Sequence, residues 1–138
     1  MTHERILLDS NAWSDLMRGD REVSTLIRES RRVLMSAIVV GELEYGFRRG
    51  TRAERNQQLL DDFMDAPVVR FLIVTRTTAD RFGRVMARLR ERGQPIPTND
   101  VWIAAHALET GATLVTRDKH FERVDGLAVE WLDRKSPG

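Results

Sequence analysis

Near its N-terminus the chain carries a short apolar run that ends at an acid, Ile6-Leu7-Leu8-Asp9-Ser10-Asn11. A short run of branched apolar residues bounded by polar turn residues is typical of a strand buried in a parallel sheet. Parallel strands of an open α/β sheet end at one edge, and ligands bind in the crevice beyond that edge. The stretch therefore predicts a parallel sheet and a functional acid, Asp9, at the carboxyl end of one of its strands.

Four further runs rich in branched apolar residues predict the other strands, at residues 33–36, 71–74, 113–116 and 128–132. The run at 6–8 and the first three of these are almost continuously apolar, which predicts strands buried on both faces. The segments between the runs are long enough to hold the crossover helices that parallel strands need.

Helical periodicity and capping residues predict helices over residues 11–17, 22–30, 36–49, 52–66, 77–92 and 100–110. Ser36 is a favoured N-cap, Pro67 stops the fourth helix, and Gly93 and Gly111 suit helix C-termini. The alternation predicts an α/β fold with a five-stranded, mainly parallel sheet flanked by helices on both faces. A length of 138 residues suits a single domain, residues 1–138, with one core.

Four acids occupy corresponding places around the predicted sheet edge: Asp9, Glu42, Asp100 and Asp118. Asp9 directly follows the first strand, and Asp118 lies just beyond the fourth. Glu42 lies in the helix after the second strand, and Asp100 begins the helix before the fourth. Four carboxylates in one place repel one another strongly unless a cation lies between them. The pattern therefore predicts a site for a divalent metal ion.

The composition narrows the choice of metal and of compartment. The chain has no cysteine, which excludes thiolate ligands and disulfides, and we assign none of its three scattered histidines to the metal. A carboxylate-rich site fits a hard cation such as Mg²⁺ better than zinc. No apolar run approaches the ~20 residues of a membrane span, and the run at 6–8 is too short for a signal peptide. We therefore expect a cytoplasmic protein.

The sequence around each acid resembles a motif of the PIN-domain ribonucleases. The four stretches are Leu7-Leu8-Asp9-Ser10-Asn11, Glu42-Leu43-Glu44-Tyr45-Gly46, Asp100-Val101-Trp102-Ile103-Ala104-Ala105 and Leu114-Val115-Thr116-Arg117-Asp118-Lys119-His120-Phe121. They occur in the family's order, and the match runs from residue 6 to about 132. Within the family the chain is most similar to the VapC toxins of toxin–antitoxin pairs. It is short and carries Gly93-Gln94-Pro95-Ile96 ahead of the third acid.

This resemblance implies a PIN-like fold and an endoribonuclease that hydrolyses RNA phosphodiester bonds with Mg²⁺ or Mn²⁺. It also implies a homodimer and a small cognate antitoxin that blocks the site. Two positions depart from the commonest family pattern. Ser10 stands where threonine is frequent and still supplies a hydroxyl, and Asp118 stands where the family varies between Asp and Asn.

Carried over position by position, the resemblance implies four catalytic and metal-site acids: Asp9, Glu42, Asp100 and Asp118. Asp9 and Asp100 are expected to bind the metal directly. Glu42 and Asp118 are expected to act through water or to position the attacking water. Three further residues are expected to orient a carboxylate or a water from behind: Ser10, Asn11 and Thr116.

Other interpretations of the same residues stay open. Asp9 and Asp118 are also good N-caps, and Asp100 is also an acid that the dipole of a helix favours in its first turn. The alternative functions are a housekeeping PIN nuclease in RNA maturation and a non-catalytic PIN module that binds RNA or protein.

The basic residues are almost all arginine, since only Lys119 and Lys135 are lysine among the 22 Lys and Arg residues. A GC-rich genome explains this bias without any function. One stripe recurs at helical spacing within residues 77–92: Arg81, Arg84, Arg88 and Arg92. We expect it to be mostly a solvated face. The alternative is contact with an RNA backbone, whose affinity falls steeply as salt rises.

Overall fold

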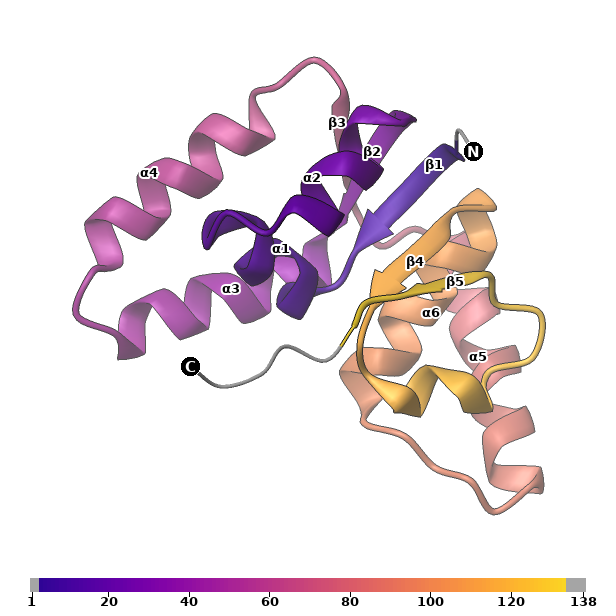
Figure 1. The fold of residues 1–138 in the computed structure, drawn as a ribbon. Helices are drawn as coiled ribbons and strands as arrows, with labels where there is room; N and C mark the ends of the chain where they lie inside the picture. The colour runs from indigo at the N-terminus through magenta and orange to yellow at the C-terminus, as the bar shows by residue number, and fades with distance from the viewer. Residues whose placement is uncertain (1–2, 134–138) are drawn as a thin grey trace.

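The computed structural model describes residues 3–133 (Figure 1). The strands are β1 (His3–Leu8), β2 (Ser30–Ser36), β3 (Val69–Leu72), β4 (Thr113–Thr116) and β5 (Val129–Trp131). The helices are α1 (Ser10–Met17), α2 (Arg21–Arg28), α3 (Ala37–Arg49), α4 (Ala53–Met64), α5 (Arg76–Glu91), α6 (Thr98–Thr110) and the 3₁₀ helix η1 (Lys119–Arg123). Residues 1–2 and 134–138, which the predicted domain includes, lie outside the described residues.

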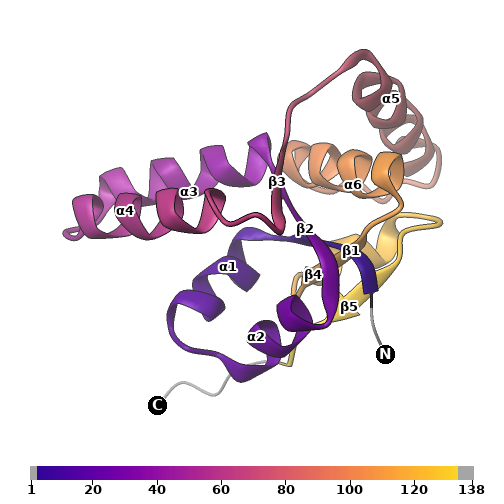
Figure 2. The ribbon, with the colours of Figure 1, turned by 90° about the horizontal axis from the view of Figure 1, so that it is seen from above.

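The strands form one sheet in the order β3-β2-β1-β4-β5, and every neighbouring pair is parallel. Figure 2 shows α1 and α2 on one face of the sheet and α3 to α6 on the other. The predicted α/β fold, with a five-stranded parallel sheet between helices, is confirmed.

The chain order explains where a site can form. From β1 the chain proceeds outward through β2 to β3, and it then crosses back to β4 on the other side of β1. The connections that follow β1 and β4 therefore leave in opposite directions, which opens a crevice beyond the carboxyl ends of these two strands. Asp9 follows β1 directly and Asp118 lies between β4 and η1, so both residues lie at this crevice.

The helix ends follow from the local sequence. Ser36 caps α3, because its side-chain oxygen accepts a hydrogen bond from the backbone N–H of Ile38. Thr75 and Thr78 form a reciprocal capping box at the start of α5. α6 ends at Gly111, whose φ of +70° favours glycine. All six predicted helices are confirmed, with small shifts at their ends.

The third strand differs from its prediction. It spans Val69–Leu72 rather than 71–74, and it forms one edge of the sheet, paired with β2 alone. Phe71 is 51% exposed, and Ile73 and Val74 lie beyond the strand and are exposed as well. The prediction that this strand is buried on both faces is therefore wrong. An apolar run does not reveal whether a strand has a neighbour on each side.

The core lies around the central strands, whose carboxyl ends border the crevice. Ile6, Leu7 and Leu8 of β1 have no exposed surface. Trp13 of α1 packs on Phe47 of α3 with 5.7 Å between the ring centroids, which ties these two helices together. Within residues 3–133, no helix combines the length and the apolar character that a membrane crossing requires.

Candidate active site

Asp9 leaves the carboxyl end of β1 and caps α1. Its Oδ1 accepts a hydrogen bond from the backbone N–H of Ser10 at 2.9 Å. Its Oδ2 accepts hydrogen bonds from the Thr116 hydroxyl at 2.8 Å and from Asn11 Nδ2 at 3.2 Å. Burial raises the pKa of Asp9, although the hydrogen bonds from Thr116 and Ser10 lower it. The carboxylate is therefore held in one orientation in surroundings that disfavour its charge.

Asn11 and Thr116 join the ends of β1 and β4. Thr116 Oγ1 accepts a hydrogen bond from the backbone N–H of Asp118 at 3.0 Å. Asn11 donates from Nδ2 to Thr116 Oγ1 at 3.3 Å, and its Oδ1 accepts from the backbone N–H of Arg117 at 3.3 Å. These contacts fix the turn that carries Asp118 relative to Asp9.

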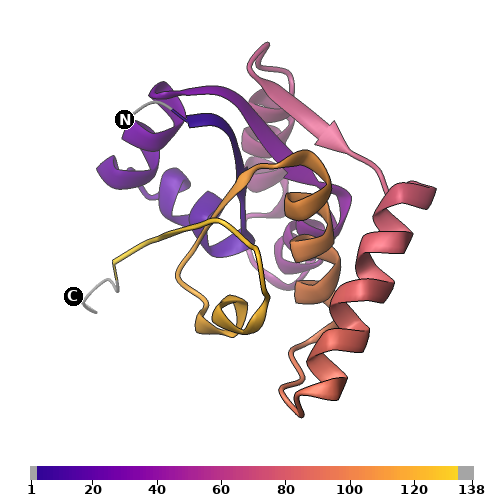
Figure 3. The same ribbon diagram turned by 90° about the vertical axis from the view of Figure 1, so that its right-hand side faces the viewer.

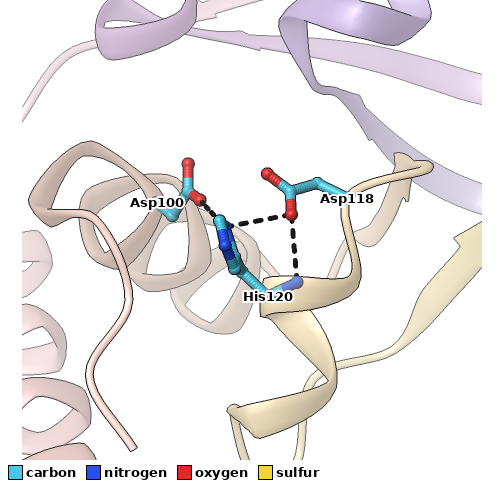
Figure 4. Close-up of side chains that lie close together, drawn as sticks. All are labelled: Asp100, Asp118 and His120. Atoms are coloured by element: carbon cyan, nitrogen blue, oxygen red, sulfur yellow. Dashed lines mark hydrogen bonds and ion pairs between the residues drawn. The ribbon is translucent and has the colours of Figure 1, made fainter.

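Asp100, Asp118 and His120 form a second group, whose side chains point toward one another in Figure 4. Asp100 lies in the first turn of α6, and Asp118 caps η1 by accepting the backbone N–H of His120 at 3.0 Å. His120 Nδ1 lies 3.3 Å from Asp100 Oδ2 and 3.0 Å from Asp118 Oδ1. One possible ligand atom from each residue lies within 4.8 Å of the other two.

The two groups act on each other electrostatically. The pKa of Asp100 is raised to about 6, mainly by burial and next by the charge of Asp9, while the hydrogen bond with His120 lowers it. The charge of Asp118 likewise contributes to raising the pKa of Asp9. The acids from β1, α6 and the turn after β4 therefore share one crevice.

Glu42 reaches the same crevice from α3. Burial raises its pKa, and the charges of Asp9 and Asp100 raise it further. Its Oε2 accepts a hydrogen bond from Asn99 Nδ2 at 3.5 Å, whereas its Oε1 is buried without a hydrogen-bond partner among residues 3–133. A cavity of about 600 Å³ opens beside Glu42, and Ser10 is among its lining residues.

The predicted role of the Ser10 hydroxyl in orienting a carboxylate or a water stays a prediction. Within the part of the chain that the structure describes, Ser10 reaches Asp9 through its backbone N–H, and no hydrogen bond of its hydroxyl is present. Both predicted N-caps are observed, at Asp9 and Asp118. Asp100 also lies in the first turn of its helix, as the dipole interpretation expects.

The donor set fits a divalent cation. The pKa values of Asp9, Glu42 and Asp100 are all raised, and other acids of the set contribute to each rise. A cation relieves this kind of repulsion. The orphaned Oε1 of Glu42 adds an acceptor that a bound cation or its water would satisfy. Four carboxylates and one imidazole suit Mg²⁺ or Mn²⁺ better than a closed zinc site.

His120 is not among the predicted site residues, and none of the histidines is assigned to the metal in the sequence analysis, yet His120 lies between two of the predicted acids. A signal for it exists in the sequence. The residue two positions after a capping acid donates its backbone N–H to that acid, which brings its side chain close. His106, in contrast, is structural, with Nδ1 2.8 Å from Ser36 Oγ and Nε2 3.0 Å from the carbonyl oxygen of Ile73.

A buried ion pair behind the crevice also escapes the sequence patterns. Arg117, between Thr116 and Asp118, pairs with Asp15 of α1, whose side chain is 1% exposed. Arg18 binds the same carboxylate at 2.6 Å. The pair ties α1 to the turn after β4 across 102 residues of sequence, a separation that no local motif signals.

The model of the PIN domain matches residues 6–127 of the chain. The chain therefore belongs to the PIN domain family.

Its relatives within that family are VapC proteins. Ribonuclease VapC2 of Rickettsia felis is 32% identical over 110 residues, which cover 79% of this chain and 81% of the relative. The tRNA(fMet)-specific endonuclease VapC of Salmonella typhimurium is 31% identical over 132 residues, which cover 91% of this chain and 96% of the relative. Each match covers at least 79% of both chains, so the chain is of the VapC type.

Solved structures agree with this relationship. The crystal structure of VapBC2 from Rickettsia felis, bound to a DNA fragment from its promoter, matches with a TM-score of 0.82 at 27% identity. This match covers 94% of this chain and 99% of the other. DNA-bound VapBC from Salmonella typhimurium matches with a TM-score of 0.82 at 26% identity, over 92% and 97% of the two chains.

Proposed function

We propose that this chain is a metal-dependent endoribonuclease and the toxin of a toxin–antitoxin module, built as one PIN domain over residues 1–138. The observation that carries the proposal is the convergence of four acids and His120 at the crevice beyond β1 and β4. The names of the VapC relatives support ribonuclease chemistry. With cellular RNA as the proposed substrate, we also propose a cytoplasmic location.

Asp9 and Asp100 are the direct ligands of Mg²⁺ or Mn²⁺ in this proposal, and Asp118 and His120 flank them. When bound, the cation lowers the pKa of a water molecule and neutralises charge on the phosphate that is attacked. Asp9 is kept in place by hydrogen bonds from Thr116 and Asn11, so its carboxylate keeps one orientation. Because the Asp9 side chain is already ordered, binding of the cation does not have to offset the entropic cost of ordering it.

Glu42 positions the attacking water. Its free Oε1 accepts a hydrogen bond from that water, while Asn99 holds Oε2. The raised pKa of Glu42 makes its carboxylate a stronger base than an exposed glutamate. A proton leaving the water therefore has an acceptor at Oε1.

The proposed partners are a cognate antitoxin and a second copy of the chain. The solved neighbours titled VapBC support an antitoxin. An antitoxin segment in the cavity beside Glu42 would block the crevice. The exposed apolar side chains of Phe71, Ile73 and Val74, at and beyond the edge strand, support a homodimer.

The test is an RNA-cutting assay with protein that mass spectrometry shows to be free of any partner. Total RNA is incubated with Mg²⁺, with Mn²⁺ or with EDTA, and Asp100→Asn is the inactive variant. Asp62→Asn, at an exposed position on α4, is the matched control for the same chemical change. Discrete fragments that need both the metal and Asp100 are expected, and mapped ends would separate a narrow toxin target from RNA maturation. No cutting with any metal would refute the enzyme and favour a binding module.

A further inference from the structure

A second cavity, of about 430 Å³, lies between α5 and the segment that joins η1 to β5. Its charged wall consists of Arg81, Arg84, Arg88 and Arg123. Its apolar floor consists of Val85, Leu89, Leu108 and Val124. Figure 3 shows α5 running down the right-hand side of the molecule beside α6, with η1 near the lower edge. We call this cavity the arginine groove.

The arginine groove carries an excess of positive charge. Among its described lining residues, four guanidinium groups face one carboxylate, that of Asp125. Asp125 is engaged by Arg88 at 3.2 Å and by Arg92 at 2.6 Å, and hydrogen bonds from these two side chains lower its pKa. Arg84 pairs with Asp80 on its own helix, an exposed contact that competes weakly with a phosphate.

The sequence spacing and the fold both contribute to this arrangement. Arg81, Arg84 and Arg88 share a face of α5 because they are three and four residues apart. Arg123 comes from the end of η1, and its Nη1 donates to the carbonyl oxygen of Pro95 at 2.8 Å. Helical periodicity reveals the first three residues, whereas the fourth joins them through tertiary structure.

η1 connects the arginine groove to the candidate active site. His120, near the start of η1, contacts Asp100 and Asp118, and Arg123 ends the same helix. Three residues of 3₁₀ helix advance about 6 Å. This rise is short on the scale of a nucleic-acid strand, which advances about 3.4 Å per nucleotide.

From this geometry we propose that the arginine groove binds the backbone of the RNA strand next to the phosphodiester that is cut, which rests on the proposed ribonuclease function. Planar guanidinium groups match phosphate oxygens in a bidentate fashion. The apolar floor accommodates the face of a base or a ribose. A site that bound phosphate by charge alone would not need these apolar residues. Every nucleotide of a strand brings both a phosphate for the wall and a base or ribose for the floor, whereas an acidic peptide needs additional apolar side chains to fill the floor.

The test measures the binding of single-stranded RNA in EDTA, where no cutting occurs, as a function of salt concentration. R81Q/R84Q removes two exposed guanidinium groups from the wall. R31Q/R32Q, at exposed positions near the opposite ends of the strands, removes the same charge elsewhere and is the matched control. For R81Q/R84Q we expect about tenfold weaker binding and a salt slope smaller by about 1.4, from roughly 0.7 per lost phosphate contact on a single strand.

D125N tests the same inference in the opposite direction. Loss of the Asp125 charge removes an acidic partner from Arg88 and Arg92, and Arg88 then keeps only its exposed 3.7 Å pair with Glu91 among the described residues, so RNA binding should tighten and the salt slope should steepen. Circular dichroism and urea unfolding of each variant show whether the fold is intact. If R81Q/R84Q binds less RNA but also has an altered fold, the result for D125N decides the test. Unfolding cannot produce the tighter RNA binding that is predicted for D125N.

The outcomes separate this inference from the proposed function. If wild-type protein cuts RNA and R81Q/R84Q matches R31Q/R32Q in affinity and slope, the arginine groove does not bind RNA. If D125N fails to tighten binding, the inference is also refuted. A third outcome is that R81Q/R84Q and D125N shift binding as expected but wild-type protein cuts no RNA with any metal. In that case the arginine groove binds RNA and the catalytic proposal is refuted.

Discussion

Asp100→Asn should stabilise the metal-free protein, although it removes a proposed metal ligand. The pKa of Asp100 rises from 3.8 to about 6 in the folded chain, because burial and the charge of Asp9 both disfavour its carboxylate. The folded state thus holds this proton more tightly than the unfolded state does. The stability linked to the protonated carboxyl is complete below pH 3.8 and is lost as pH rises through about 6.

Asparagine at position 100 carries no charge at any of these pH values, so the variant avoids this loss. The difference between 3.8 and about 6 corresponds to about 3 kcal/mol at pH 7.5, about 1.5 kcal/mol at pH 5 and almost nothing at pH 3. The Asp100 side chain is 12% exposed, so solvent screening is limited. At pH 7.5 the gain corresponds to a rise of roughly 10 °C in melting temperature for a chain of this length.

The assay is urea unfolding of partner-free protein in EDTA, at pH 5 and at pH 7.5, for wild type and Asp100→Asn. Asp62→Asn makes the same chemical change at an exposed position and should unfold like wild type at both pH values. Mg²⁺ added at pH 7.5 should then stabilise wild type more than Asp100→Asn, because a ligand that binds the folded state alone adds to its stability.

Two results would refute this reasoning. One is an Asp100→Asn variant that is no more stable than wild type at pH 7.5 without metal. The other is a gain of equal size at pH 5 and pH 7.5, since a gain from relieved charge repulsion must grow between these values. Either result would mean that Asp100 is not held among like charges.

Three further changes test the supports of the site. Asp15→Asn leaves Arg117 without its buried carboxylate and should cost about 3 kcal/mol in urea unfolding; a cost near zero would deny the pair a structural role. Thr116→Val removes a hydrogen bond that lowers the pKa of Asp9, so the acidic limb of the kcat/KM profile should move to higher pH rather than stay in place. Phe121→Ala empties the buried anchor of η1 and should cost about 3–5 kcal/mol, measured by urea unfolding; a loss below 1 kcal/mol would show that η1 is held in another way.

The sequence predicts the sheet well because burial on both faces leaves a local trace. The apolar runs around Leu7 and Leu114 mark central strands, and each is fully buried in the structure. The run at 71–74 misleads because three of its four residues, Phe71, Ile73 and Val74, lie at or beyond the sheet edge and are exposed. Local composition records how apolar a segment is, and the position of a strand in the sheet depends on pairing with distant segments.

In the candidate site, too, some residues can be predicted from local sequence and others depend on tertiary contacts. The four acids are predictable because each follows a strand or sits in a helix whose place the topology fixes. His120 and the pairing of Arg117 with Asp15 are not predictable from periodicity, since they depend on a short turn and on a contact across 102 residues. The arginine groove is intermediate, because periodicity aligns its α5 residues and the fold adds Arg123.

The two interpretations of Asp9 and Asp118, as helix caps and as metal ligands, are compatible in this geometry. Asp118 uses Oδ1 for the backbone N–H of His120, and no hydrogen bond within residues 3–133 engages its Oδ2. Asp9 Oδ2 accepts two hydrogen bonds, whereas its Oδ1 accepts one and keeps a second lone pair free. Capping therefore fixes each carboxylate before a cation arrives, while burial and mutual repulsion keep the pKa of Asp9 raised. The caps thus supply the rigidity, and the repulsion supplies the driving force, that a cation site at this crevice requires.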